Sequence, residues 1–141
     1  MIRCSYELTV RGYELDSFGH VNNSVYLQYA ETAMWNIFRV KGLLDAINAE
    51  GLFPVILESS QRYIHELHML DEVRIDSQMS CSSGIVRYKH NIINKTTGLL
   101  ACRVTGKLAY VNRERIICDV PEAVKKCLES DSDGNEIRNK D

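Results

Sequence analysis

The segment 16–29 holds the residues best suited to chemistry. It combines a carboxylate, a glycine, an imidazole and two amides just before a run with helical periodicity: Asp16, Gly19, His20, Asn22 and Asn23. A helix N-terminus presents free backbone N–H groups and a partial positive charge, which suit an anion or a developing oxyanion. A carboxylate a few residues upstream could act there as a nucleophile or as a general base on water.

The same residue types also have structural uses. Aspartate and asparagine favour turns and helix caps, so Asp16 could cap a turn, and Asn22 or Asn23 could cap the helix. On the residues alone, both interpretations of this segment stay open.

A second stretch, His65-Glu66-Leu67-His68, has some likeness to a metalloprotease helix motif. Its histidines are three residues apart instead of four, and it lies at the end of an expected strand. The five cysteines contain no CxxC pair, which argues against a zinc site and against a disulfide framework. We therefore expect no metal and no cofactor.

The elements that position these residues follow from hydrophobic periodicity. Alternation predicts a strand over 3–13, and a loop over 14–24 leads into the helix. Apolar residues at helical spacing predict a long helix from Val25 to about Lys41, with a short helical turn over 43–51. Alternation and turn signals then predict four consecutive strands: Val55–Leu67, Glu72–Ser82, Ile85–Ile93 and Leu100–Tyr110.

This order of elements predicts the fold class. Without βαβ alternation, a doubly wound nucleotide-binding sheet is excluded. The long helix is apolar over more than half of its surface, so it needs a sheet that wraps around it. We therefore expect an α+β hotdog fold, with a five-stranded antiparallel sheet wrapped around one central helix. A helix over 121–129 closes the domain 1–129, and a disordered tail is expected over 130–141.

Composition limits the partners. The chain has 141 residues, 17 basic and 19 acidic, and a net charge of -2, so nucleic acid is not an expected partner. No window of 18 apolar residues exists, and the N-terminus is too polar for a signal peptide. We expect a cytoplasmic protein without a membrane span.

The pattern D-x-x-G-H-V-N-N-x-x-Y at Asp16–Tyr26 resembles the hotdog-fold acyl thioesterases of the 4-hydroxybenzoyl-CoA thioesterase type. The resemblance implies that Asp16 is the catalytic carboxylate, as nucleophile or as general base. It also implies that the thioester carbonyl is polarised by N–H groups near the helix start, at Asn23, Ser24 and Val25, supplemented by Gly19. Substrate-binding residues are expected at Asn22, Tyr26 and Tyr63.

The role of His20 is open between direct acid–base chemistry and a place in the loop that lines a subunit seam. Trp35 and Phe38 are expected in the core or in the wall of an acyl pocket. Family members place residues of the strand that carries Tyr63 near the pantetheine channel, although a cross-strand aromatic in the core is an equal alternative.

The resemblance implies hydrolysis of an acyl-CoA or acyl-ACP thioester to free acid and thiol. Two alternatives stay open: a hotdog dehydratase or hydratase that acts on an acyl thioester, and a non-catalytic acyl-CoA-binding module. A small sheet with open edges gains by pairing, so we expect a homodimer, with a homotetramer left open.

Overall fold

A single sheet and one long helix organise the chain. The computed structural model describes residues 1–130 and 136–140, with only the backbone for 130 and for 136–140. The strands are β1 (Ile2–Thr9), β2 (Phe53–Tyr63), β3 (Glu72–Ser82), β4 (Ile85–Asn94), β5 (Leu100–Val111), β6 (Ile117–Cys118) and β7 (Glu136–Lys140). The helices are the short 3-10 helix η1 (Gly12–Glu14), α1 (Asn23–Val40), α2 (Leu43–Glu50) and α3 (Glu122–Ser130).

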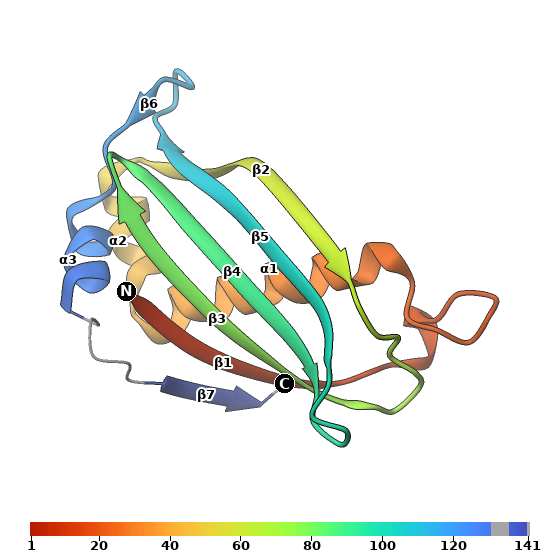
Figure 1. Ribbon diagram of the computed structural model, residues 1–141. Helices are drawn as coiled ribbons and strands as arrows, with labels where there is room; N and C mark the ends of the chain where they lie inside the picture. The colour runs from red at the N-terminus through yellow and green to blue at the C-terminus, as the bar shows by residue number, and fades with distance from the viewer. Residues whose placement is uncertain (131–135, 141) are drawn as a thin grey trace.

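The sheet has the strand order β2-β5-β4-β3-β1-β7, and β6 pairs with the end of β5. All pairs among β1 to β5 are antiparallel, whereas β7 runs parallel to β1. Helix α1 crosses one face of this curved sheet (Figure 1). The α+β hotdog architecture is thus confirmed.

The apolar periodicity explains the packing of α1 on the sheet. The helix buries Tyr26, Ala30, Ala33 and Ile37 on one stripe, and Phe38 widens it. The facing strands contribute every second residue to the core, including Val73, Ile75 and Met79 of β3 and Val86 and Ile92 of β4.

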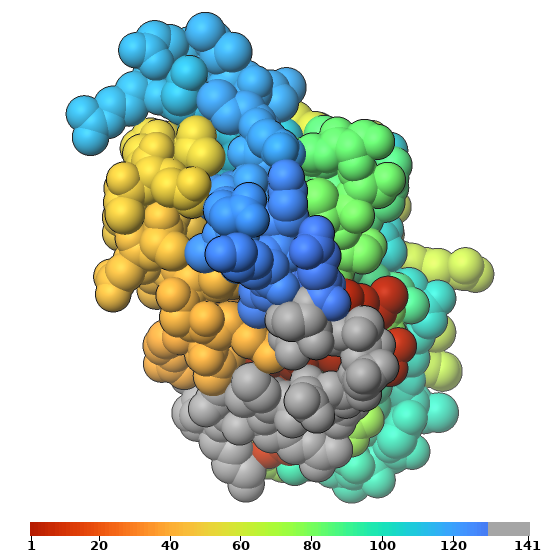
Figure 2. Space-filling model, turned by 90° about the vertical axis from the view of Figure 1, so that its left-hand side faces the viewer, coloured from red at the N-terminus to blue at the C-terminus, as the bar shows by residue number. Residues whose placement is uncertain are grey.

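Helices α2 and α3 close one end of the sheet. Figure 2 shows α3 between α2 and the turn that joins β3 to β4. At the opposite end, where the loop before α1 projects, the only helices that the described residues form are the short η1 and the start of α1 (Figure 1).

The structure differs from the expected elements at three places. The first strand ends at Thr9 and is followed by η1, because the chain must turn toward the start of α1. The second strand ends at Tyr63, where the N–H groups of Ile64 and His65 both donate to the Ala101 carbonyl and the chain leaves the sheet. The sheet has seven strands instead of five.

The structure also differs from the disordered tail that was expected over 130–141. Its residues 136–140 form β7 beside β1, so the prediction of disorder is wrong there. Residues 131–135 and 141 lie outside the described part of the chain, and the domain boundary at 129 stays a prediction.

The two edges of the sheet are unequal. β1 is covered by β7, whereas β2 pairs only with β5 among the described strands. Large apolar side chains on β2 are exposed, with Phe53 at 44%, Ile56 at 52% and Leu57 at 48%. None of the helices in the described part of the chain is long and apolar enough to cross a membrane.

Candidate active site

The loop that carries Asp16 is folded by its own hydrogen bonds. Asp16 Oδ1 accepts from the backbone N–H groups of Phe18 (2.9 Å) and His20 (3.1 Å). The N–H of Gly19 donates to the Asp16 carbonyl (3.2 Å), and Gly19 adopts a φ of 82°, which favours glycine. The turn-capping interpretation of Asp16 is confirmed for Oδ1, whereas Oδ2 accepts no hydrogen bond from the described residues.

Glu14 attaches this loop to the central helix. Its buried carboxylate accepts hydrogen bonds from the Tyr29 hydroxyl (2.8 Å) and the Arg11 N–H (2.7 Å), and its carbonyl accepts from the Asn22 N–H (2.9 Å). Burial and the neighbouring Glu14 carboxylate raise the pKa of Tyr29 far above its usual range, so its hydroxyl stays a donor. Sequence reasoning missed Glu14, because a single acid in a loop carries no spacing signal.

The start of α1 is capped by Asn22. Its Oδ1 accepts from the Ser24 N–H (3.2 Å), and its carbonyl accepts from the Val25 N–H (2.9 Å). The N–H groups of Gly19, Ser24 and Val25, all expected as oxyanion donors, are therefore bonded within the protein. The N–H of Asn23 makes no hydrogen bond to the described residues, and it remains available to a ligand.

His20 meets two residues of the loop that follows β2. Its Nε2 lies 3.1 Å from Glu66 Oε2, and its ring packs edge to face on His68 with the ring centroids 5.1 Å apart. The backbone holds the two loops together, because the Val21 N–H donates to the Leu67 carbonyl (2.9 Å). The Glu66 partner of His20 was not expected from the sequence.

Metal binding would use the same three side chains. One ligand atom from each of His20, Glu66 and His68 lies within 4.8 Å of the other two. Two imidazoles and a carboxylate form a donor set that zinc accepts. The histidine spacing of the stretch 65–68 made metal binding improbable, but the fold adds His20 from a distant loop to its Glu66 and His68.

The loop that carries Asp16, the start of α1 and the end of β2 with the segment after it line one cavity of about 280 Å³. The Tyr63 hydroxyl at its wall donates to the Asn23 carbonyl (3.3 Å), and the Tyr26 hydroxyl accepts from the Leu67 N–H (3.1 Å). Its lining includes the expected residues Asp16, His20, Asn23, Tyr26 and Tyr63, together with Glu66. The other expected residues shape the loop and the helix start outside that lining: Gly19, Asn22, Ser24 and Val25.

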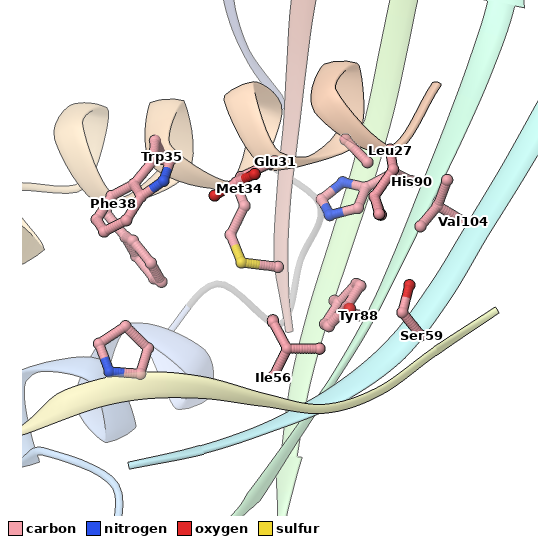
Figure 3. A pocket seen from close by; sticks show the side chains of 12 residues that line it. Leu27, Glu31, Met34, Trp35, Phe38, Ile56, Ser59, Tyr88, His90 and Val104 are labelled. Carbon is pink, nitrogen blue, oxygen red and sulfur yellow. The ribbon is translucent and has the colours of Figure 1, made fainter. Parts of the chain in front are cut away.

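A second, mainly apolar cavity of about 310 Å³ begins one turn further along α1, at Leu27. It lies between α1 and the strands β2, β4 and β5, with Met34 and Ile56 on opposite walls (Figure 3). Trp35 and Phe38 both line it, and Phe38 is also buried in the core. The site thus combines a polar cavity at the helix start with an apolar one along the helix.

Two known proteins are similar in sequence to part of this chain. The chain is 30% identical over 78 residues to the long-chain acyl-CoA thioesterase FadM of Escherichia coli, covering 55% of this chain and 59% of FadM. It is 31% identical over 90 residues to the chloroplastic acyl-acyl carrier protein thioesterase ATL3 of Arabidopsis thaliana, covering 63% of this chain and 47% of ATL3. The matched segments therefore span about half of these relatives.

Solved structures share the fold at low identity. The 1,4-dihydroxy-2-naphthoyl-CoA thioesterase Slr0204 from Synechocystis superposes with a TM-score of 0.84 at 18% identity, covering 94% of this chain and 99% of Slr0204. The probable thioesterase YbaW from Escherichia coli superposes with a TM-score of 0.80 at 21% identity, covering 89% of this chain and 96% of YbaW. The family model of the Thioesterase-like superfamily matches residues 10–128. This chain therefore belongs to the Thioesterase-like superfamily of hotdog proteins.

Proposed function

We propose that the protein hydrolyses an acyl-CoA or acyl-ACP thioester to a free acid and a thiol. One observation carries the proposal: Asp16 and Asn23, whose backbone N–H has no hydrogen-bond partner among the described residues, line the same cavity at the start of α1. The relatives' activities support it, since FadM is a long-chain acyl-CoA thioesterase and ATL3 an acyl-acyl carrier protein thioesterase.

We assign different roles in the reaction to the Asn23 N–H and the Asp16 carboxylate. The thioester carbonyl oxygen accepts a hydrogen bond from the Asn23 N–H, where the partial positive charge of the helix end stabilises the developing oxyanion. The Asp16 carboxylate either attacks the carbonyl carbon or removes a proton from an attacking water. The C–S bond then breaks, and the thiolate leaves with the electron pair. When Asp16 is the nucleophile, a water then hydrolyses the acyl anhydride on Asp16 to the free acid; when Asp16 is the base, the attacking water supplies the oxygen of the free acid directly. In both routes the proton released by the water converts the thiolate to the thiol.

His20 and Glu66 supply an acid–base pair beside Asp16. Their contact of 3.1 Å at the rim of the cavity suits a histidine that is held in place by a carboxylate. The same pair is the observation that favours the second candidate, a dehydratase or hydratase, because such enzymes move a proton next to a thioester with a histidine and an acid.

We further propose that the active form is a homodimer paired through β2. The exposed apolar side chains of this edge strand support the pairing, and Tyr63 lies at the end of the same strand, beside the site. A homotetramer could form from two such dimers.

Product analysis tests the proposed reaction. The purified protein is incubated with acyl-CoAs of several chain lengths, a 3-hydroxyacyl-CoA and an aryl-CoA, and both free thiol and enoyl absorbance are followed. We expect thiol release in a 1:1 ratio with free acid. Enoyl-CoA formation without thiol would instead identify a dehydratase, and tight binding of acyl-CoA and acyl-ACP without either product would identify a binding module.

A further inference from the structure

His90 carries a buried polar atom that the proposed reaction does not use. Its side chain is 0% exposed on β4, and its Nε2 has no hydrogen-bond partner among the described residues. The other ring nitrogen, Nδ1, lies 2.6 Å from the Ser77 hydroxyl on β3. A buried polar atom without a partner costs free energy, so this nitrogen calls for a ligand or a water.

His90 is one of the residues that line the apolar cavity. Figure 3 shows the His90 ring projecting into the space between Met34 of α1 and Tyr88 of β4. Most of the remaining wall is apolar, so His90 is placed where a few polar groups typically fix the orientation of a ligand.

The apolar cavity begins close to the proposed site of the thioester along α1, although the two cavities share no lining residue. Leu27 at its wall follows Asn23 by one helical turn, which is about 6 Å along α1. On the sheet, His90 pairs with Val104, which pairs with Gln61, two residues before Tyr63 on β2. Two residues of a strand span about 7 Å and two strand spacings about 10 Å, so the backbone of His90 lies roughly 12 Å from that of Tyr63.

We propose that the cavity binds an acyl group that carries a hydroxyl part way along its chain, and that His90 Nε2 forms a hydrogen bond with this hydroxyl. The inference rests on the proposed function, because it assigns the acyl part of the thioester to this cavity. A volume of about 310 Å³ lies at the lower end of the range of small-molecule pockets, about 300–1,000 Å³.

The chemistry of His90 selects a hydroxyl over other oxygen groups. Burial lowers the pKa of His90 to about 4, so the ring is neutral near pH 7 and offers no charge to a carboxylate. A neutral imidazole has one N–H donor and one bare acceptor nitrogen. A hydroxyl can both donate and accept, so it fits Nε2 in either tautomer, whereas a keto oxygen fits only the N–H form.

The experiment compares decanoyl-CoA with its 3-, 6- and 10-hydroxy derivatives. For the wild type, we expect kcat/KM for at least one hydroxy derivative to exceed that for decanoyl-CoA by about tenfold or more. In His90→Phe, which keeps a ring of similar size, this preference disappears while decanoyl-CoA is still hydrolysed. Met34→Leu, which changes an apolar wall residue at nearly constant volume, keeps the preference.

Three results would overturn the inference: a wild type that prefers no hydroxy derivative, a preference that survives in His90→Phe, or one that Met34→Leu abolishes equally. If His90→Phe does not fold, His90→Gln replaces it, because the glutamine amide restores a hydrogen-bonding group on a differently placed atom. We expect His90→Gln to keep part of the preference, and a preference equal to that of the wild type would also overturn the inference.

Calorimetric binding of the free acids separates this inference from the proposed function. If the protein hydrolyses no acyl-CoA, the proposed function fails, but tighter binding of a hydroxydecanoic acid than of decanoic acid, lost in His90→Phe, still supports the role of His90. Equal binding of the acids overturns that role even if the enzyme is an active thioesterase.

Discussion

At the scale of single residues, we propose two tasks for Asp16, one on each carboxylate oxygen. Oδ1 holds the loop through two backbone N–H groups, and Oδ2 is left for chemistry. The structural and catalytic interpretations of this residue are therefore compatible. Each carboxylate oxygen has its own environment, so a substitution that keeps Oδ1 and removes the charge separates the two tasks.

His90 predicts a pH dependence of stability. Its pKa of about 4 in the folded protein lies below the ordinary value of 6.5, so between these pH values the unfolded chain binds a proton that the folded chain does not. Stability therefore falls as the pH decreases from about 6.5 to 4, by roughly 3 kcal/mol for the full shift. In denaturant unfolding measured from pH 7 to 4, the free energy of unfolding should fall less for His90→Phe than for the wild type. An equal fall in both proteins would contradict the lowered pKa of His90.

The cluster of His20, Glu66 and His68 gives a prediction on metals. Because a thiolate is a good leaving group, an oriented carboxylate and an oxyanion site can suffice without a metal. We expect thiol release to be unchanged after treatment with EDTA and dialysis, measured beside an untreated sample. Loss of activity on chelation that zinc restores would show instead that these three side chains hold a catalytic metal.

The motif residues could be identified from the sequence, whereas the residues that contact them in the fold could not. Asp16, His20 and Asn23 are close in sequence and line one cavity, whereas their catalytic roles stay a prediction. Glu66 reaches His20 only through the fold. His90 stood at an inward position of an alternating strand, between Tyr88 and Ile92, and a polar residue at such a position is a usable signal for a buried site.

At the scale of elements, the start of α1 decides where the Asn23 N–H points, and Asn22 holds that start. Asn22→Ala removes the side-chain acceptor of the Ser24 N–H and should lower the free energy of unfolding by about 1 kcal/mol. Asn22→Asp keeps an acceptor oxygen and places a negative charge at the helix N-terminus, so it should be close to the wild type. Urea unfolding of the three proteins checks this order, and equal stability of both variants would contradict the capping role.

Periodicity predicted the elements that pack on both sides of the core, because their burial repeats with a helical or strand period. α1, β3, β4 and β5 agree with the expected ranges to within a few residues. β7 was missed because its residues, Glu136–Lys140, contain one apolar side chain and pair through the backbone of β1. η1 was missed because a three-residue turn has no period to detect.

At the scale of the whole molecule, the exposed edge of β2 predicts the assembly. Leu57→Glu places a charge on this edge and should shift the protein from dimer to monomer in light scattering, with a loss of thiol release if the site needs both subunits. Ile116→Glu is the matched control, since Ile116 is 61% exposed in the turn before β6. A wild-type monomer with full activity would contradict the proposed dimer.

The central claim is that the Asp16 carboxylate performs the hydrolysis at the start of α1. The most direct measurement is the rate of thiol release by Asp16→Asn, beside Asp45→Asn on the exposed surface of α2 as the matched control. The asparagine Oδ1 can still accept from the Phe18 and His20 N–H groups, so the melting temperature should stay close to that of the wild type. We predict a loss of about a hundredfold or more in kcat/KM for Asp16→Asn and none for Asp45→Asn; equal activity of Asp16→Asn and the wild type would contradict the account.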